Sequence, residues 1–193
     1  MCGTIEHLLA DPEMKSLVEQ LNPGFQPPSR PFTRMDYKAA IEWLNEHDIK
    51  NDEGQPHKIG DDIAEAAERK MTDALNVPIF LCGFPREIKA FYMKQDPTDP
   101  RLALCVDMLA PEGYGEIIGG GERISDLELL EKRIAEHELP IESYQWYLDI
   151  RRYGTVPHSG FGIGLERTVS WICGLNHVRE TVPFPRMLTR MYP

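Results

Sequence analysis

The sequence has few cysteines, no long apolar run and no excess of positive charge. Its four cysteines are scattered without a CxxC pair, which argues against both a zinc knot and a disulfide framework. The longest apolar runs, such as residues 77–82, fall far short of the roughly 20 residues that a membrane helix needs. Residues 1–4 do not begin a signal peptide, which would have a basic segment followed by an apolar one. We therefore expect a soluble protein of a reducing compartment, with no membrane partner.

Two common nucleotide-binding motifs are absent as well. A GxGxxG fingerprint that began at Gly160 would need a third glycine at position 165, which is leucine. No GxxxxGK[ST] loop occurs either. These absences argue against dinucleotide-binding Rossmann enzymes and P-loop enzymes. The formal net charge of −10 argues against general electrostatic attraction to nucleic acid, so any such contact must be local.

Residues 1–76 are predicted to be mainly helical. Helical patterns cover about 5–21, divided at Pro12, and a second helix is expected after Asp36, which can cap it. The apolar positions of this second helix recur on one face and are Tyr37, Ala40, Ile41 and Leu44. A third helix is expected from Asp61 or Asp62, with an apolar side made of Ile63, Ala66, Ala67, Met71 and Ala74.

Residues 77–193 are predicted to form a sheet with further helices. Short apolar runs between glycines and prolines indicate strands at 78–82, 89–93, 102–109 and 116–124, the last two as an antiparallel hairpin. Ser125–Glu128 is a capping-box pattern that predicts a helix of about twelve residues, and another helix is expected around 141–150. The fold class is therefore α+β, an antiparallel sheet flanked by helices.

Three glycines near the carboxyl end alternate with the period of a strand. Gly160, Gly162 and Gly164 would leave one face of that strand without side chains, so that a planar base could lie on bare backbone. Arg167 follows where the strand turns into a helix, and a fixed guanidinium there can hold a phosphate or pack on an adenine ring. The alternative is a strand thinned for close packing against a neighbouring helix.

Two carboxylates flank the predicted hairpin turn. Asp107 and Glu116 could together supply the acidic ligands that Mg²⁺ takes beside water and phosphate oxygens. The alternative is a pair of solvated charges, although the apolar setting of Asp107 would make an unpaired carboxylate costly. Arg123 could place a donor in the same cleft or form a surface ion pair with Glu122, Asp126 or another exposed carboxylate.

Two other side chains are weaker candidates. Lys89 could face a ligand or extend its ammonium to solvent, and His158 precedes the glycines but is more simply structural. The histidines have no metal-ligand spacing, and no Ser-His-Asp or Cys-His nucleophilic set is apparent.

Several segments in order resemble one family. They are residues 84–93, 106–109, 115–120, 146–154, 160–167 and 182–186. Together they resemble the asparaginyl-tRNA synthetases, class II aminoacyl-tRNA synthetases of the aspartate/asparagine subgroup.

The resemblance implies roles for particular residues. Residues 160–167 look like the third signature motif, in which Arg167 and the three glycines bind ATP. Asp107 and Glu116 match the acidic pair that holds Mg²⁺ on the ATP phosphates, and Arg123 matches the arginine that binds the side chain of the substrate amino acid. Arg167 and Glu116 are the residues expected to act in catalysis.

The implied reaction has two steps. The carboxylate of asparagine attacks the α-phosphate of ATP and releases pyrophosphate, and asparagine is then transferred to its tRNA. Such chemistry depends on positioning and charge neutralisation rather than on a protein nucleophile. The complete enzyme is expected to be a homodimer in the cytoplasm, with an organelle as the alternative.

The resemblance covers only the carboxy-terminal portion of a catalytic domain. An anticodon-binding OB-fold domain and the first and second signature motifs are absent from residues 1–193, so the sheet is expected to have an incomplete core and an exposed edge. Two alternatives follow. One is a catalytically incomplete fragment or paralogue that binds nucleotide or a partner. The other is a synthetase-like asparagine synthetase that acts on aspartate.

Overall fold

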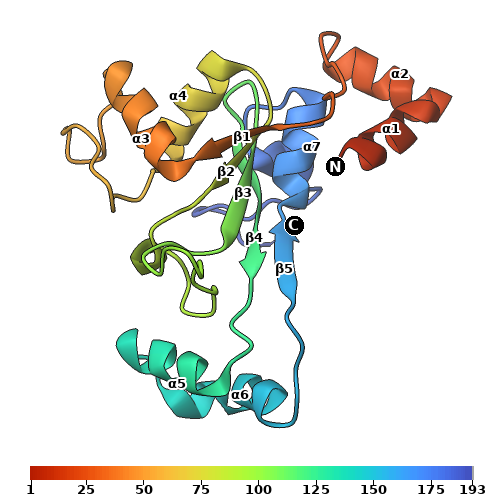
Figure 1. The fold of residues 1–193 in the computed structure, drawn as a ribbon. Coiled ribbons are helices and arrows are strands. Elements are labelled where there is room, and N and C mark those ends of the chain that lie inside the picture. Colours follow the sequence, from red (N-terminus) through yellow and green to blue (C-terminus); the bar gives the residue numbers. More distant parts are fainter. Residues whose placement is uncertain (193) are drawn as a thin grey trace.

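A five-stranded sheet organises the chain (Figure 1). The computed structural model describes residues 1–192, and the strands lie side by side in chain order. They are β1 (Thr33–Asp36), β2 (Ile79–Cys82), β3 (Cys105–Ala110), β4 (Gly115–Glu122) and β5 (Ser159–Ile163). Pairing is antiparallel from β2 to β5, whereas β1 runs parallel to β2. The expected α+β class is confirmed, but the sheet is mixed and not wholly antiparallel as expected, because β1 pairs in parallel with β2.

Seven α-helices and three short 3₁₀ helices are found among residues 1–192. The α-helices are α1 (Cys2–Ala10), α2 (Pro12–Leu21), α3 (Tyr37–Glu46), α4 (Glu65–Leu75), α5 (Leu127–Glu136), α6 (Gln145–Arg152) and α7 (Leu165–Cys173). The 3₁₀ helices are η1 (Arg86–Ile88), η2 (Ile141–Tyr144) and η3 (Val178–Thr181). The predicted division at Pro12 is confirmed, because Asp11 caps α2 by accepting the backbone N–H groups of Glu13 and Met14. No helix of this described range has the length and apolar character needed to cross a bilayer.

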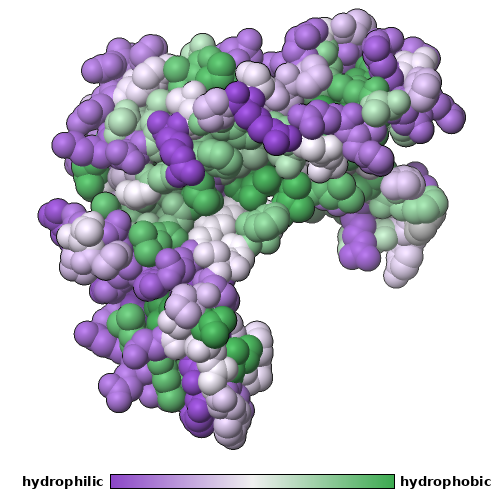
Figure 2. Space-filling model, turned by 45° about the vertical axis from the view of Figure 1, so that its right-hand side comes forward, coloured by the Kyte–Doolittle hydropathy of each residue, from purple (hydrophilic) through white to green (hydrophobic). Residues whose placement is uncertain are grey.

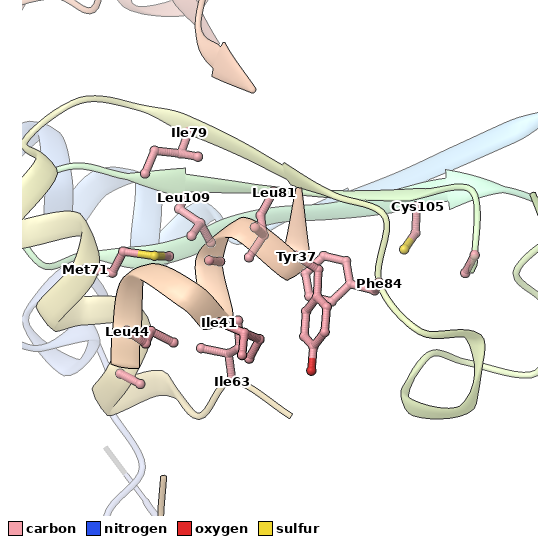
Figure 3. Close-up of a cluster of buried hydrophobic side chains, with 13 residues drawn as sticks. Tyr37, Ile41, Leu44, Ile63, Met71, Ile79, Leu81, Phe84, Cys105 and Leu109 are labelled. Carbon is pink, nitrogen blue, oxygen red and sulfur yellow. The ribbon is translucent and has the colours of Figure 1, made fainter. Parts of the chain in front are cut away.

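Helices cover both faces of the sheet. On one face α3 and α4 pack on β2 and β3 (Figure 3), and the predicted apolar face of α3 is buried as expected. On the other face α1, α2 and α7 pack around Trp171, whose ring meets Phe25 edge-on. A third cluster joins α5 and α6 to the segment around Phe91. The α5–α6 pair lies beyond the ends of β4 and β5, and the space-filling view shows a concave outline between this lobe and the rest (Figure 2).

Some expected elements are wrong. The predicted strand at 89–93 is instead the exit from η1, with one isolated bridge from Met93 to Arg123. The helix expected from Asp61 or Asp62 begins at Glu65. Its Ala66 and Ala74 are exposed, because the buried side carries Glu68 and Thr72.

The remaining boundaries shift by a few residues. Asp126, not Ser125, caps α5 and accepts the N–H of Leu129 at 2.8 Å. The helix expected at 141–150 is divided into η2 and α6. The strand β1 was not predicted, since its four residues are mostly polar and show no buried face.

Candidate active site

A β-bulge places two carboxylates on one face of the sheet. Asp107 pairs with Gly119, and Leu109 pairs with Glu116, while Met108 pairs with Ile118. One extra residue, Ile117, therefore stands in β4 between paired positions. Paired residues share a face and neighbours along a strand alternate, so the bulge turns Glu116 to the face of Asp107.

The two carboxylates converge above Gly119. A Cβ atom added to Gly119 would stand 2.5 Å from Oε1 of Glu116 and 3.4 Å from Oδ1 of Asp107. The space that a side chain would fill is thus occupied by carboxylate oxygens. Glycine at this position is what lets the acidic pair approach one point.

Lys89 belongs to the same site. Its Nζ donates to Oδ2 of Asp107 at 2.6 Å, and the side chains are 20% and 9% exposed, respectively. The ammonium also lies 3.6 Å from the centroid of the Phe84 ring. Of the two roles left open by the sequence, the structure supports the one in which Lys89 faces the site, and Asp107 is not a solvated charge.

Glu68 is a site residue that the sequence did not reveal. It projects from α4, is buried, and has a pKa raised to about 7 by burial first and then by Glu116 and Asp107. The pKa of Glu116 is also raised, by burial and by Asp107, while Lys89 and Arg167 oppose the shift. Three acidic side chains, Glu68, Asp107 and Glu116, therefore lie close together, and their combined negative charge favours a bound cation.

The glycine strand lies on the face of the acidic pair. Gly160 pairs with Gly121 and Gly162 with Gly119, which places both on the face that carries Asp107. A Cβ at Gly162 would meet nothing within 4 Å. Bare backbone is therefore open here, and the reading of β5 as a strand thinned against a helix is not supported at this position.

Gly164 departs from the predicted strip. It precedes α7 as its N-cap residue, and a Cβ there would lie 3.5–3.6 Å from the Arg167 side chain. Nη1 of Arg167 donates to the backbone oxygen of Glu116 at 2.6 Å. The start of α7 therefore brings Arg167 beside the acidic pair.

Arg123 lies at the far end of the same face. Its guanidinium carbon is 4.7 Å from the centroid of Tyr92, and Nη1 is 3.2 Å from Sδ of Met93. A Cβ added to Gly160 would stand 3.0 Å from Nη2. Glu122 pairs instead with Lys94, and within residues 1–192 no carboxylate forms an ion pair with Arg123, contrary to the alternative of a surface ion pair. The guanidinium thus contacts the Tyr92 ring and the Met93 sulfur but no carboxylate, so its positive charge can interact with a ligand.

His158 has a backbone role. Its carbonyl oxygen accepts the N–H of Arg123 at 2.9 Å, and its ring contacts the carbonyl of Val156. These contacts hold the strand ends together, which agrees with the structural reading of this histidine.

The acidic pair fits a magnesium ion that is completed by other ligands. The described part of the chain holds no group of three or more histidine, cysteine or acidic side chains arranged for a metal. Magnesium needs only one or two carboxylates when water and phosphate oxygens supply the rest. Asp107 and Glu116 converge above Gly119 and have the chemistry that such a site would need.

A cavity of about 1320 Å³ reaches the glycine strand at Gly160, which lines it together with Cys105 and Gly121 of the same row. Its lining includes Cys82, Val106, Gly120 and Phe161, which are register partners in one row across the sheet. Val106 directly precedes Asp107, and Gly120 directly follows Gly119, the partner of Asp107. Because neighbours along a strand alternate, the row of Val106 and Gly120 faces away from Asp107. Neither Arg167 nor the acidic pair lines this cavity.

Comparison with known proteins identifies related chains. A family model described as tRNA synthetases class II (D, K and N) matches residues 3–188. The chain is 55% identical over 163 residues to the asparagine–tRNA ligase of Pelotomaculum thermopropionicum, covering 84% of this chain and 36% of that protein. It is 51% identical over 190 residues to the cytoplasmic asparagine–tRNA ligase of Saccharomyces cerevisiae, covering 98% of this chain and 34% of that protein.

A solved structure shares the fold. The asparaginyl-tRNA synthetase of Entamoeba histolytica in complex with asparaginyl-adenylate superposes with a TM-score of 0.93 at 41% identity. The match covers 100% of this chain and 43% of that one. The chain thus spans about a third of the length of the curated relatives that it matches.

Proposed function

The chain belongs to the class II tRNA synthetases of the D, K and N family, and we propose that it carries the nucleotide and amino-acid part of an asparagine–tRNA ligase site. The reaction is the activation of asparagine with ATP as asparaginyl-adenylate, followed by transfer of asparagine to tRNA. One observation carries this proposal. Arg167, Glu116, Asp107 and Arg123 lie on the face of Gly160 and Gly162, where Gly160 is covered by Arg123 and the backbone of Gly162 is open.

ATP is proposed to bind on the glycine backbone. A purine ring can lie on the face of Gly162, where no side chain stands within 4 Å of a Cβ position. The guanidinium of Arg167, anchored on the Glu116 carbonyl, can stack on that ring or contact a phosphate. Gly160 and Gly164 flank this position along the chain. The adenylate bound to the Entamoeba relative supports a site for this ligand class.

Asp107 and Glu116 are proposed to hold Mg²⁺ on the ATP phosphates. The ion would neutralise charge on the phosphates as pyrophosphate leaves. The pKa of Glu116 is raised first by burial and then by Asp107, and a cation bound beside it would favour its charged form. Lys89 holds the Asp107 carboxylate in place by a direct hydrogen bond.

Arg123 is proposed to bind the side-chain end of asparagine. A guanidinium has donors only, so it suits the amide oxygen of asparagine. It suits the carboxylate of aspartate equally well, and Arg123 alone does not separate the ligase from an asparagine synthetase that activates aspartate. The identities to asparagine–tRNA ligases favour asparagine.

The larger setting follows from the relatives. We propose that the chain corresponds to the carboxy-terminal portion of the catalytic domain, since it matches about a third of their length. The complete enzyme is proposed to act on tRNA as a cytoplasmic homodimer. The yeast relative is itself a cytoplasmic enzyme.

A second function has its own support. A chain that matches a third of an enzyme can bind adenine nucleotide without making aminoacyl-tRNA. ATP–pyrophosphate exchange separates the two, because exchange requires the adenylate to form.

The test is calorimetric titration of the chain with ATP and Mg²⁺, with and without asparagine. Arg167→Ala should abolish saturable binding, while Arg179→Ala, an exposed arginine of η3, should leave it intact. Absence of heat from folded wild-type chain would overturn nucleotide binding by this chain. Binding that persists in Arg167→Ala would overturn the role of Arg167.

A further inference from the structure

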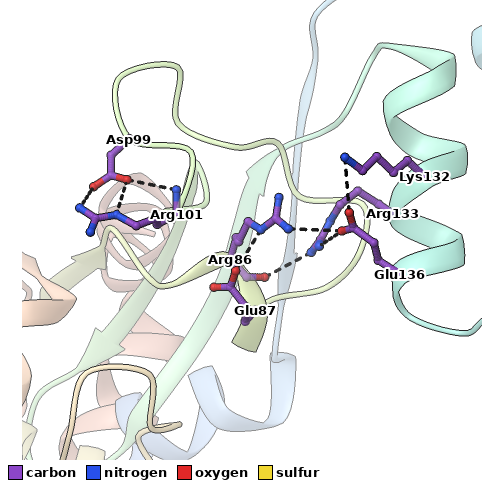
Figure 4. A network of polar contacts seen from close by, with 7 residues as sticks. All are labelled: Arg86, Glu87, Asp99, Arg101, Lys132, Arg133 and Glu136. Carbon is purple, nitrogen blue, oxygen red and sulfur yellow. Dashed lines mark hydrogen bonds and ion pairs between the residues drawn. The ribbon is translucent and has the colours of Figure 1, made fainter.

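The turn that carries Lys89 is held from α5. In η1 the carbonyl oxygen of Arg86 accepts the backbone N–H of Lys89 at 3.4 Å. The same oxygen accepts Nη2 of Arg133 at 3.3 Å (Figure 4). One carbonyl thus joins a side chain of α5 to the backbone of the residue whose ammonium reaches Asp107.

Arg133 is an unusual residue to find so deep in the protein. It is 4% exposed, and its Nη1 donates to Oε2 of Glu136 at 2.7 Å. Glu136 also accepts from Nη2 of Arg86 at 3.3 Å, so one carboxylate links both arginines (Figure 4). The pKa of Glu136 is lowered, first by the hydrogen bond from Arg133. The loss of water around a buried guanidinium is unfavourable and must be offset by a partner, and the pairing with Glu136 here ties α5 to η1.

The segment after Lys89 is anchored to the same lobe. The ring of Phe91 packs edge-on against Tyr144 and Tyr147, at centroid distances of 5.0 and 6.4 Å. Lys89 thus lies between two attachments to the α5–α6 lobe, one polar and one aromatic. The polar one ends on the carbonyl that bonds the Lys89 backbone.

We propose that Arg133 is a positioning residue for Lys89. By fixing the Arg86 carbonyl it sets where the Lys89 side chain leaves the backbone, and so lets the ammonium meet both Asp107 and the ring of Phe84. The use of this arrangement in adenylate formation rests on the proposed function. The geometric coupling between Arg133 and Lys89 does not, and it is testable by itself.

The first test measures the accessibility of the Lys89 amine. The full chain is acylated with a limiting amine reagent, and modification at each lysine is read by mass spectrometry. In Arg133→Met the labelling of Lys89 should rise several-fold, whereas Lys94, which is paired with Glu122, should label at its original rate. Lys132→Met is the matched control, because Lys132 contacts Glu136 from the surface but does not touch η1.

The outcomes are decisive in each direction. Unchanged Lys89 labelling in folded Arg133→Met overturns the proposal, and so does an equal rise at Lys94, which would indicate general loosening. If Arg133→Met does not fold, Arg133→Lys replaces it. A single ammonium can keep the pair with Glu136 but cannot also fork to the Arg86 carbonyl, so Lys89 should again label faster.

The second test measures MgATP binding by calorimetry. Arg133→Met should weaken binding by the same factor as Lys89→Met, and the double variant should show no further loss. Independent, multiplying losses would contradict a role through Lys89. If the wild-type chain binds no MgATP, the proposed function fails for this chain, while the labelling experiment still decides whether Arg133 positions Lys89.

Discussion

Asp107 and Glu116 share a face of the sheet because one extra residue, Ile117, interrupts the alternation of β4. In a regular strand that kept Ile117 paired, Glu116 would instead point to the side of Ile118 and Met108, into the core around Trp171. The bulge therefore determines which face of the sheet carries Glu116. It converts a hairpin with carboxylates on opposite faces into one with both over Gly119.

Gly119→Ala should disrupt the acidic pair. The new methyl group would stand 2.5 Å from the Glu116 oxygen, so the carboxylate must move. We expect magnesium-dependent ATP affinity to fall about tenfold, or ~1.4 kcal/mol. Calorimetric titration at several Mg²⁺ concentrations measures this. Gly24→Ala, where a Cβ meets nothing within 4 Å, is the control, and equal affinity in both variants would contradict the proposed metal site.

Lys89→Met should destabilise the fold. It leaves Asp107 buried without its partner, a loss that costs about 3–5 kcal/mol in a fully buried pair and about 2–3 here, because Lys89 is partly exposed. Urea unfolding measures the difference. Lys50→Met, which breaks an exposed pair with Asp48, should cost no more than about 1 kcal/mol. Adding Asp107→Asn to Lys89→Met should recover part of the loss; no recovery would show that the charge is not the cause.

The stability of the chain should fall as pH rises from about 4.5 to 7. Glu68 has a folded-state pKa of about 7, above its unfolded value, so the folded state holds a proton that the unfolded state has released. By linkage, the free energy of unfolding declines across that window, by about 2–3 kcal/mol from Glu68 alone. Glu116, with its pKa also raised, adds a slope of the same sign.

Glu68→Gln isolates that contribution. The neutral amide should flatten the decline and make the chain more stable than wild type at pH 8. Urea unfolding at pH 5 and pH 8 gives the comparison. Glu46→Gln, on the exposed end of α3, should keep the wild-type slope. A Glu68→Gln chain with the wild-type slope would place the titrating group elsewhere.

Two glycines of β5 should separate the nucleotide from the amino acid. In Gly160→Ala the methyl group would press on Nη2 of Arg123 at 3.0 Å, so asparagine should lose its effect on ATP binding while ATP itself still binds. In Gly162→Ala the methyl group fits the free chain but stands where the base would lie, so ATP binding should fall at unchanged melting temperature. Calorimetry with and without asparagine distinguishes these patterns, and identical behaviour of the two variants would contradict the proposed placement of the ligands.

Features encoded within a few residues could be predicted from the sequence. The alternation of Gly160 and Gly162 is a property of one strand, and the buried face of α3 is a property of one helix. The hairpin that brings Asp107 near Glu116 also follows from local turn signals. In each case the information lies in the segment itself.

Features that depend on distant contacts could not be predicted. Glu68 becomes a site residue only because α4 packs over β4. Of the predicted apolar side, Ile63, Ala67 and Met71 are buried, whereas Ala66 and Ala74 are exposed. Lys89 reaches Asp107 from the position directly after η1, in the segment 89–93 that was predicted to be a strand. Gly164 continues the glycine spacing, yet α7 begins there and Arg167 covers it. Tertiary packing decided all three.

The α5–α6 lobe is an insertion in the connection between β4 and β5. β4 and β5 are immediate neighbours, and the N–H of Arg123 bonds the carbonyl of His158 where the chain leaves and returns. A tight turn could therefore replace residues 125–157 without changing how any strand is paired. A miniaturised sheet of this kind would keep its register but lose the external brace on Lys89, so the lobe serves the accuracy of the pocket rather than the assembly of the sheet.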